Sequence, residues 1–310
     1  MLRILFSAKP DRWDEYKSPL EIAFAEAGVP VDLATDHPPE DVDYIIFAPN
    51  GPVRDFTPYV RAKAVMSLWA GVETVVDNAT LTQPLTRMVD HGLTRGMVEW
   101  VTGHVLRHHL GMDSHIHGQD GIWRDDKVPP LATDRHVTIL GLGALGIACG
   151  QALSYLGFPV TGWSRTAKTA GAINCLHGVD GLQAALKTAD ILVLLLPLTQ
   201  ETTGLINAQT IAQLPQNAII INPGRGPLIN DTDLLDALDT GHISHATLDV
   251  FATEPLPAQH PFWAHNGVTV TPHIASTTRA KTAAQTIAQN IKAHESGAPL
   301  ANLVDRRTGY

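Results

Sequence analysis

Short apolar runs alternate with amphipathic stretches along the 310-residue chain. In the first third, buried strands are predicted at Leu2–Phe6, Tyr44–Phe47 and Val65–Leu68. A helix is predicted over Pro19–Ala27, with Ser18 as its N-cap, Pro19 at the first helical position and Gly28 after its end. Strands that alternate with helices indicate a parallel sheet with crossover connections.

A second and longer series of the same kind begins at Arg135. Its expected strands are His136–Leu140, Val160–Trp163, Ile191–Leu196, Ala218–Ile221, His245–Asp249 and Val268–Thr271. Its expected helices are Leu142–Leu156, Gly181–Thr188, Ala208–Leu214, Asp231–Thr240 and finally Ser276–His294. Near-continuous apolar strands are typical of a parallel sheet that is covered on both faces.

The two series predict an α/β protein of two Rossmann-like domains, each with a parallel sheet, and a cleft between them. Residues 99–275 form the expected dinucleotide-binding domain, and residues 1–98 together with 276–310 form the expected substrate domain. We expect closure of the cleft on the substrate, which would exclude water from the reacting atoms.

The segment between the two series predicts a homodimer. A helix expected over Gly96–Leu110 is apolar over more than one face, and a turn-rich arm, Gly118–Asp134, carries Ile122 and Trp123 without a core of its own. Packing of both segments against a second subunit would cover them. Burial of the helix between the two domains of one chain is the alternative.

Composition narrows the class of protein. A net charge of −9 without a basic cluster argues against nucleic acid or an anionic membrane as a partner. The longest apolar run, Ile191–Leu196, is far shorter than a membrane span, and no targeting segment is recognised near Met1, so we expect a cytoplasmic protein. The two cysteines, Cys149 and Cys175, are expected to be buried free thiols.

A glycine-rich turn lies between the first strand and the first helix of the second series. Gly141, Gly143 and Gly146 fit the pattern G-x-G-x-x-G, and the turn is completed by Leu142, Ala144 and Leu145. These glycines allow a tight turn, a close approach of the backbone to a pyrophosphate, and close packing of the helix on the sheet. In this strand–turn–helix context the motif predicts a dinucleotide site at a helix N-terminus.

The end of the next strand indicates which dinucleotide binds. Ser164, Arg165 and Thr166 stand where NAD-binding proteins place a carboxylate for the ribose 2′-hydroxyl, and Lys168 follows. A hydroxyl and a guanidinium suit a 2′-phosphate, so NADP(H) is the expected cofactor, with NAD(H) possible. The alternative is that Arg165 and Lys168 are solvated loop charges.

Three later segments carry reactive side chains where apolar strands end: Asn222–Gly226 with Arg225, Asp249–Leu256 with Glu254, and Thr271–Ala275 with His273. Arginine can bind a carboxylate and polarise a ketone, and histidine can protonate the developing alkoxide. A carboxylate beside an imidazole stabilises its charged form. Separately, each could be a surface charge, a turn residue or a capping histidine.

With these motifs, the chain resembles the D-isomer-specific 2-hydroxyacid dehydrogenase family over nearly its whole length. The resemblance rests on GLGALG, LPLTQETTGLI from Leu196, NPGRG from Asn222, DVFATEPL from Asp249 and TPHIA from Thr271. Within the family, the chain is most similar to group A of the bacterial glyoxylate/hydroxypyruvate reductases. This implies NADPH-dependent reduction of a small 2-keto acid, such as glyoxylate or hydroxypyruvate, to the D-2-hydroxy acid.

The resemblance also implies roles for individual residues. Arg225 would bind and polarise the substrate, His273 would be the general acid/base, Glu254 would tune it, and Asp249 would hold the nicotinamide carboxamide. The substrate carboxylate would meet backbone N–H groups of Trp69, Ala70, Gly71 and Val72, although relatives more often have a small residue at the position of Trp69. Further implied cofactor contacts are Leu196, Pro197, Thr202, Pro223, Gly224 and Ala275, alongside Arg225 and His273.

Two other interpretations belong beside this one. Some relatives with this fold are NAD(H)-sensing transcriptional corepressors, but the set Arg225, Glu254 and His273 and the lack of an added interaction tail favour an enzyme. His104 and His108 are four residues apart, as in some metal sites, but no third ligand is evident, so no metal is expected.

Overall fold

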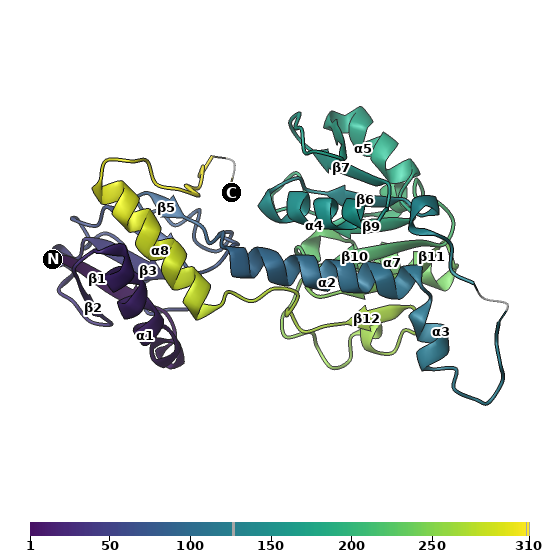
Figure 1. Ribbon diagram of the computed structural model, residues 1–310, viewed down its shortest axis with the longest axis horizontal. Coiled ribbons are helices and arrows are strands. Elements are labelled where there is room, and N and C mark those ends of the chain that lie inside the picture. Colours follow the sequence, from purple (N-terminus) through teal and green to yellow (C-terminus); the bar gives the residue numbers. More distant parts are fainter. Residues whose placement is uncertain (126–127, 308, 310) are drawn as a thin grey trace. The chain divides into compact units, whose positions relative to one another are not determined.

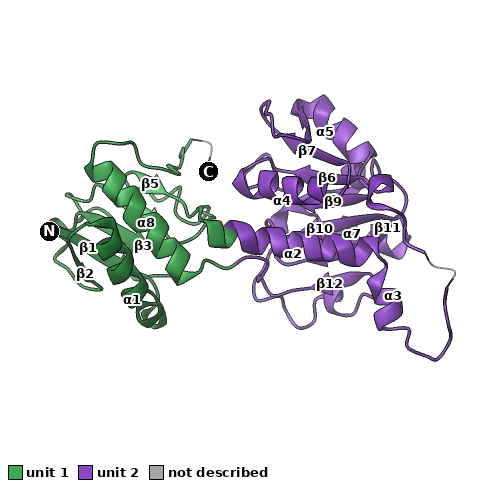
Figure 2. Cartoon of the chain, in the orientation of Figure 1, with its two compact units in different colours: residues 1–93, 277–310 green, residues 94–276 purple. Residues whose placement is uncertain are grey.

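The computed structural model describes residues 1–125, 128–307 and 309, and the chain divides into two compact units. Unit 1 comprises residues 1–93 and 277–310, and unit 2 comprises residues 94–276 (Figure 2). The first division, between residues 93 and 94, falls inside helix α2 (His91–His109). The boundary predicted from the sequence, between residues 98 and 99, lies in the same helix. Among the described residues, no helix is long and apolar enough to cross a membrane.

Unit 1 is built on a five-stranded parallel sheet in the order β2-β1-β3-β4-β5. Its strands are β1 (Leu2–Ser7), β2 (Val31–Ala34), β3 (Tyr44–Phe47), β4 (Ala64–Ser67) and β5 (Leu85–Thr86), with a short 3-10 turn η1 at Pro39–Asp41. Helices α1 (Pro10–Ala27) and α8 (Ala280–Glu295) lie side by side (Figure 1). Both pack on the sheet face that Ile4 and Ile46 line.

Helix α1 begins nine residues before the start expected from the sequence, so the assignment of Ser18 as an N-cap was wrong. The helix starts at Pro10 behind Lys9, and Pro19 lies inside it. A proline there removes only the bond to the carbonyl of Glu15, a residue on the exposed side of the helix, where water can replace that bond. Gly28 ends the helix in the left-handed conformation, as expected.

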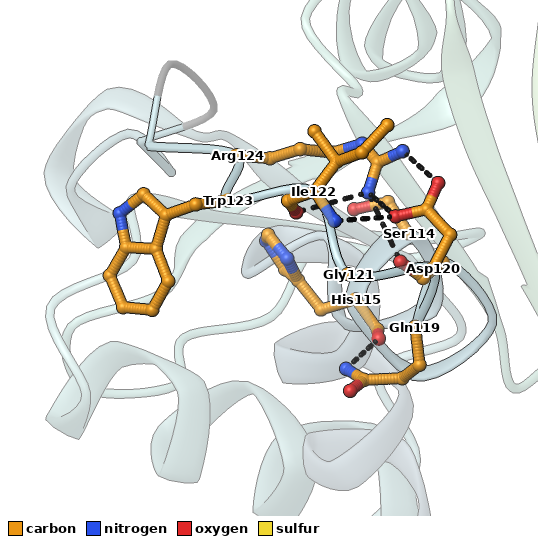
Figure 3. A pocket seen from close by; sticks show the side chains of 9 residues that line it. Ser114, His115, Gln119, Asp120, Gly121, Ile122, Trp123 and Arg124 are labelled. Carbon is orange, nitrogen blue, oxygen red and sulfur yellow. Dashed lines mark hydrogen bonds and ion pairs between the residues drawn. The ribbon is translucent and has the colours of Figure 1, made fainter.

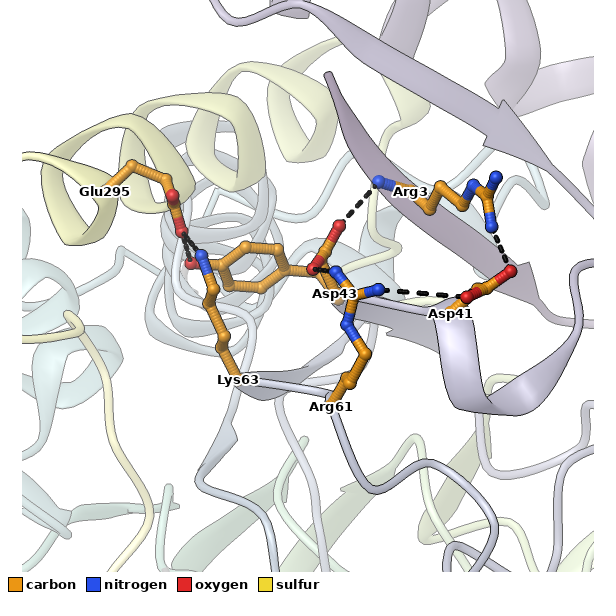
Figure 4. Close-up of polar contacts among 7 residues, drawn as sticks. Arg3, Asp41, Asp43, Arg61, Lys63 and Glu295 are labelled. Atoms are coloured by element: carbon orange, nitrogen blue, oxygen red, sulfur yellow. Dashed lines mark hydrogen bonds and ion pairs between the residues drawn. The ribbon is translucent and has the colours of Figure 1, made fainter.

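Polar side chains gather at the edge of this sheet where β1, β3 and β4 begin (Figure 4). The buried hydroxyl of Tyr44 donates to Glu295 at 2.6 Å, and Lys63 contacts the same carboxylate oxygen at 2.6 Å. Arg61 reaches Asp43 at 3.0 Å. Burial and the hydrogen bond to Glu295 raise the pKa of Tyr44. These contacts tie the end of α8 to the sheet.

Unit 2 carries a seven-stranded parallel sheet in the order β12-β11-β10-β9-β6-β7-β8. Its strands are β6 (Val137–Leu140), β7 (Val160–Ser164), β8 (Asn174–His177), β9 (Ile191–Leu194), β10 (Ala218–Asn222), β11 (Ile243–Leu248) and β12 (Val268–Val270). Its helices after α2 are α3 (Met112–Ile116), α4 (Ala144–Tyr155), α5 (Gly178–Lys187), α6 (Ala208–Ile211) and α7 (Asp231–Asp239), with 3-10 turns η2 (Ala132–Asp134), η3 (Gly226–Leu228) and η4 (Pro261–Trp263). The strand order reverses between β6 and β9, where ligands bind in open α/β sheets.

The two Rossmann-like parallel sheets confirm the predicted fold class. Short edge strands were missed: β2 and β5 in unit 1 and β8 in unit 2. The exposed and half-buried residues of β8 give no apolar run, so its sequence resembles a loop. Cys149 is buried and Cys175 is half-buried, both as free thiols.

Helix α2 packs on its own unit more completely than the sequence suggested. Val101 and Val105 are fully buried in the core against β6, and Val98, Trp100 and Leu106 pack against the same core. The helix itself therefore gives no argument for a second subunit. The arm that follows is different, because Ile122 and Trp123 are exposed. Asp126 and Lys127 of this arm lie outside the described residues.

Candidate active site

The glycine-rich turn connects β6 to the N-terminus of α4. Gly141 has φ +110°, and a Cβ atom there would lie 2.4 Å from the carbonyl oxygen of Leu195. A Cβ atom at Gly146 would lie 1.8 Å from the carbonyl oxygen of Gly141, so both positions require glycine. Space beside Gly143 is open, and this residue begins α4 without a side-chain cap. The turn thus leaves helix N–H groups available to a phosphate.

The end of β7 bears the residues that were expected to select the dinucleotide. Ser164 is buried, and its hydroxyl donates to the carbonyl oxygen of Thr166 at 2.8 Å. Arg165 is about half exposed and reaches Glu201 at 3.3 Å. Lys168 donates to the carbonyl oxygen of Leu142 at 2.7 Å, which places its ammonium group on the glycine-rich turn. Lys168 therefore lies at this turn, Arg165 follows the neighbouring strand, and residues 158–172 contain no acidic side chain.

Arg225 follows β10 in a loop that its neighbours hold tightly. Asn222 accepts from the N–H of Gly224 at 3.0 Å and donates to the carbonyl oxygen of Arg225 at 2.9 Å. A Cβ atom at Gly226 would lie 2.0 Å from the carbonyl carbon of Phe251, so the loop lies directly against the segment after β11. The half-buried arginine is thus presented from a fixed backbone.

Asp249 organises the turn that carries His273. Its carboxylate is fully buried and accepts hydrogen bonds from the Thr271 hydroxyl at 2.5 Å, from the N–H of Ile274 at 2.9 Å and from the N–H of Ala275 at 2.8 Å. The N–H of His273 donates to the backbone carbonyl of Asp249 at 2.8 Å. His273 has φ +53°, a strained value that these bonds around the turn maintain.

Glu254 and His273 are in direct contact. The Nδ1 atom of His273 lies 2.8 Å from Oε2 of Glu254, while Oε1 of Glu254 accepts from the N–H of Phe251 at 2.9 Å. A carboxylate at Nδ1 requires the proton to be on that nitrogen. Nε2 is then the atom that can exchange a proton with a substrate, and the side chain is half exposed.

The loop after β4 in unit 1 contains the other expected substrate residues. The N–H of Trp69 donates to the Ser67 hydroxyl at 3.0 Å, so it is already used within the loop. Within residues 1–125, 128–307 and 309, no acceptor contacts the N–H groups of Ala70, Gly71 or Val72. Trp69 has 40% of its surface exposed and Val72 is buried.

The remaining expected residues lie in the loops that follow β9, β10 and β12. Leu196 is buried, and Thr202 donates to the carbonyl oxygen of Pro197 at 2.8 Å. Pro223 and Gly224 are buried in the Arg225 loop, and Ala275 is buried beside Asp249. Because β10, β11 and β12 are neighbours in a parallel sheet, Arg225, Glu254 and His273 all follow strand ends at one edge.

Several residues that hold the site were missed by the sequence reasoning. Thr271 lies in the TPHIA segment, but only the structure shows its bond to Asp249. The contact of Glu201 with Arg165 joins residues 36 positions apart and leaves no local signal.

His104 and His108 pack in unit 2 against the sheet and α2 itself. His108 contacts the Thr247 hydroxyl at 2.8 Å, and the ring of His104 packs at a tilt against Trp100. Within the described part of the chain, no cluster of three histidine, cysteine or acidic residues could hold a metal ion.

Comparisons with known proteins agree with this geometry. Residues 102–275 match the family described as D-isomer specific 2-hydroxyacid dehydrogenase, NAD binding domain. The chain is 39% identical over 263 residues to glyoxylate/hydroxypyruvate reductase A of Yersinia enterocolitica, covering 81% of this chain and 82% of that protein. A second relative, glyoxylate/hydroxypyruvate reductase A of Serratia proteamaculans, is 40% identical over 259 residues, with coverage of 81% and 82%.

Solved structures give the same result. A D-isomer specific 2-hydroxyacid dehydrogenase from Xanthobacter autotrophicus Py2, in complex with NADPH and MES, superposes with a TM-score of 0.92 at 39% identity over 99% of both chains. The NADPH-dependent glyoxylate/hydroxypyruvate reductase of Sinorhizobium meliloti, in complex with NADP and sulfate, gives 0.86 at 33% identity over 100% of both chains.

Proposed function

The chain belongs to the D-isomer-specific 2-hydroxyacid dehydrogenases, NAD(P)-dependent oxidoreductases, and we propose that it uses NADPH to reduce glyoxylate or hydroxypyruvate to the D-2-hydroxy acid. The contact of His273 with Glu254 carries this proposal, because it orients an imidazole for proton transfer at the same carboxyl edge of the sheet that carries the dinucleotide-type turn. The names of the relatives from Yersinia and Sinorhizobium support the substrate and the cofactor.

Unit 2 would bind the cofactor. NADPH, when bound, supplies the hydride. The glycine-rich turn and the N-terminus of α4 fit its pyrophosphate, because the space beside Gly143 is open. Arg165 and Thr166 would hold the 2′-phosphate beside Ser164, and Lys168 lies close enough to the turn to add positive charge. The carboxamide contact proposed for Asp249 stays a prediction. Its carboxylate already accepts three hydrogen bonds within its own turn, so it would have to accept a further one from the nicotinamide.

Unit 1 would bind the substrate carboxylate, through the N–H groups of Ala70, Gly71 and Val72. Arg225 would bind the 2-keto oxygen and stabilise the negative charge that develops there. His273 would donate the proton from Nε2 to that oxygen, and Glu254 would stabilise the imidazolium before the transfer.

The test is a panel of 2-keto acids with NADPH and with NADH, followed by absorbance of the reduced nicotinamide. We expect the highest kcat/KM with NADPH and glyoxylate or hydroxypyruvate. A dinucleotide sensor of the corepressor type would bind NADPH without turning over any acid in the panel, and that result would overturn the proposal. Faster turnover of bulkier acids would instead reject only the substrate assignment.

We also propose that the protein is a homodimer that packs through α3 and the arm after it. Around the arm's turn, Arg124 forms a paired contact with Asp120, and Trp123 points away from that pair (Figure 3). Trp123 has 89% of its surface exposed, and Ile116 and Ile122 are also exposed. Exposed apolar side chains that lie close together in the sequence are typical of a surface that another protein covers.

Light scattering after size exclusion tests this assembly. Wild-type protein at micromolar concentration should have the mass of two chains, and Trp123→Asp should shift it toward the mass of one. A matched control is Tyr155→Asp, which adds the same charge at another exposed aromatic residue of unit 2. A wild-type mass of one chain would refute the dimer.

A further inference from the structure

The loop after β4 has its carbonyl groups held by side chains and backbone from three parts of unit 1. Thr278, which lies just before α8, donates through its hydroxyl to the carbonyl oxygen of Leu68 at 2.9 Å. The carbonyl oxygen of Trp69 accepts from the N–H of Met88 at 2.9 Å and from the Ser67 hydroxyl at 3.1 Å. The loop has no helix or strand of its own, so these bonds fix its course.

Ser67 makes two contacts with Trp69 through one buried hydroxyl. Its Oγ accepts from the N–H of Trp69 and donates to the carbonyl oxygen of the same residue. Because only 1% of the Ser67 surface is exposed, water cannot easily replace the serine in this turn. The backbone of Trp69 is thus fully engaged, and among the described residues nothing accepts a hydrogen bond from the next three N–H groups.

Those three N–H groups belong to consecutive residues, Ala70 to Val72. Successive backbone N–H groups that converge make a concave site for an anion. The N–H of Ala70 shares a peptide plane with the Trp69 carbonyl, which Ser67 and Met88 hold, and the preceding plane contains the Leu68 carbonyl, which Thr278 holds. These two planes set the direction in which the chain enters Gly71 and Val72. Carbonyl groups that rotated into the same space would repel a carboxylate.

We infer that Ser67 and Thr278 are positioning residues for the substrate carboxylate, and that they set the affinity for 2-keto acids without touching them. The inference rests on the proposed function, which places the carboxylate at Ala70, Gly71 and Val72. Thr278 is 210 residues from Leu68 in sequence, so the start of α8 becomes part of the substrate site. The cofactor turn, residues 141–146, lies in unit 2 and is not part of this arrangement.

The experiment compares Thr278→Val, which keeps the shape of the side chain and removes the hydroxyl, with Thr278→Ser, which keeps the hydroxyl. Thr277→Val is the matched control, because Thr277 is exposed and, within the described residues, its side chain makes no hydrogen bond. Ser67→Ala tests the second contact. Steady-state kinetics with glyoxylate and NADPH are combined with calorimetric titration of oxalate, a carboxylate that cannot accept a hydride.

Loss of one hydrogen bond that orders the loop should raise KM for glyoxylate and Kd for oxalate by about fivefold in Thr278→Val, with kcat changed by less than about twofold. Thr278→Ser and Thr277→Val should behave like the wild type. Ser67→Ala should raise KM for glyoxylate and Kd for oxalate more than Thr278→Val does, because it removes both contacts to Trp69. The Kd for NADPH, measured by fluorescence, should stay unchanged in all four variants.

The outcomes separate this inference from the proposed function. Wild-type turnover with unchanged KM and oxalate affinity in Thr278→Val and Ser67→Ala would overturn the inference alone. Absence of wild-type turnover would reject the function, and the oxalate titration would then decide the inference by itself. If Thr278→Val lowered the melting temperature and weakened NADPH binding in parallel with oxalate, the threonine would be a structural residue only. The same would follow if Thr278→Ser failed to restore oxalate binding.

Discussion

Two neutral histidines packed between α2 and β11 should make unit 2 sensitive to acid. His108 and His245 have ring centroids 4.8 Å apart, and each contacts a threonine hydroxyl, Thr247 and Thr269 respectively, at 2.8 Å. Burial, and secondarily the nearby His245, lower the pKa of His108 from 6.5 to about 3. Burial, and secondarily Arg107, lower the pKa of His245 to about 4.

The sign and size of the effect follow from these values. A histidine whose pKa is lower in the folded state is protonated first in the unfolded chain, so its stabilisation is complete above pH 6.5 and is lost as the pH falls toward the folded value. A pH of 5 is about 1.5 units below the pKa of 6.5 that a histidine has in the unfolded chain. This difference lowers the free energy of unfolding by about 2 kcal/mol for each histidine, or about 4 kcal/mol for the pair. That is a large part of the roughly 5–15 kcal/mol that stabilises a typical domain.

His108→Gln isolates this contribution, because an amide can still contact Thr247 but does not titrate. We expect the variant to be less stable than the wild type by about 1–2 kcal/mol at pH 7.5, from lost ring packing. The difference in the free energy of unfolding between the wild type and the variant should change by about 2 kcal/mol in favour of the variant at pH 5. Urea unfolding of the cofactor-free protein, followed by circular dichroism at pH 5, 6 and 7.5, measures it. His245→Gln should give a change of the same sign. A gap that stays constant with pH would refute the assignment of buried neutral imidazoles.

Three further predictions concern the proposed chemistry. Ser164→Asp combined with Arg165→Ala should move the preference from NADPH toward NADH in kcat/KM, because it adds an acceptor for the 2′-hydroxyl and removes the phosphate partner; a wild type that already prefers NADH would contradict this. His273→Ala should lower kcat by roughly 10²–10⁴ while the Kd for NADPH in a fluorescence titration stays the same, and full activity would exclude His273 as the acid. Glu254→Gln should lower kcat while the Kd for NADPH stays the same, because the carboxylate 2.8 Å from Nδ1 of His273 no longer orients the ring; a kcat equal to that of the wild type would exclude Glu254 as the partner.

The fold of unit 2 could be predicted because its central strands are apolar on both faces and its helices begin with recognisable turns. The strands β6, β9 and β10 are entirely buried, so isoleucine, leucine and valine dominate them and polar residues are limited to Thr138 and Asn222. Edge strands such as β2 and β8 are half exposed and lack this signature. Helix α1 was cut short in the prediction because Pro19 was interpreted as a start, although the helix tolerates it on a solvent-facing side.

The residues of the candidate site also differ in how readily the sequence indicates them. Gly141, Arg225, Glu254 and His273 could be proposed from sequence because each belongs to a short motif whose residue types are needed for a particular chemistry. The residues that hold the Arg225 loop and the His273 turn are Asn222, Asp249 and Thr271. Thr271 has no feature that distinguishes it from other strand-end threonines until its hydroxyl is seen 2.5 Å from a buried carboxylate.

Asp249 shows why a motif can identify a residue without fixing its role. The sequence places a carboxylate at the end of β11 and leaves open what it accepts. In the folded protein its two oxygens accept from Thr271, Ile274 and Ala275, and the turn so formed gives His273 its left-handed backbone. A change at Asp249 must therefore disturb the imidazole even if the side chain also contacts the nicotinamide. Kinetic loss in an Asp249 variant would not distinguish the two roles, whereas the geometry of the turn already assigns one of them.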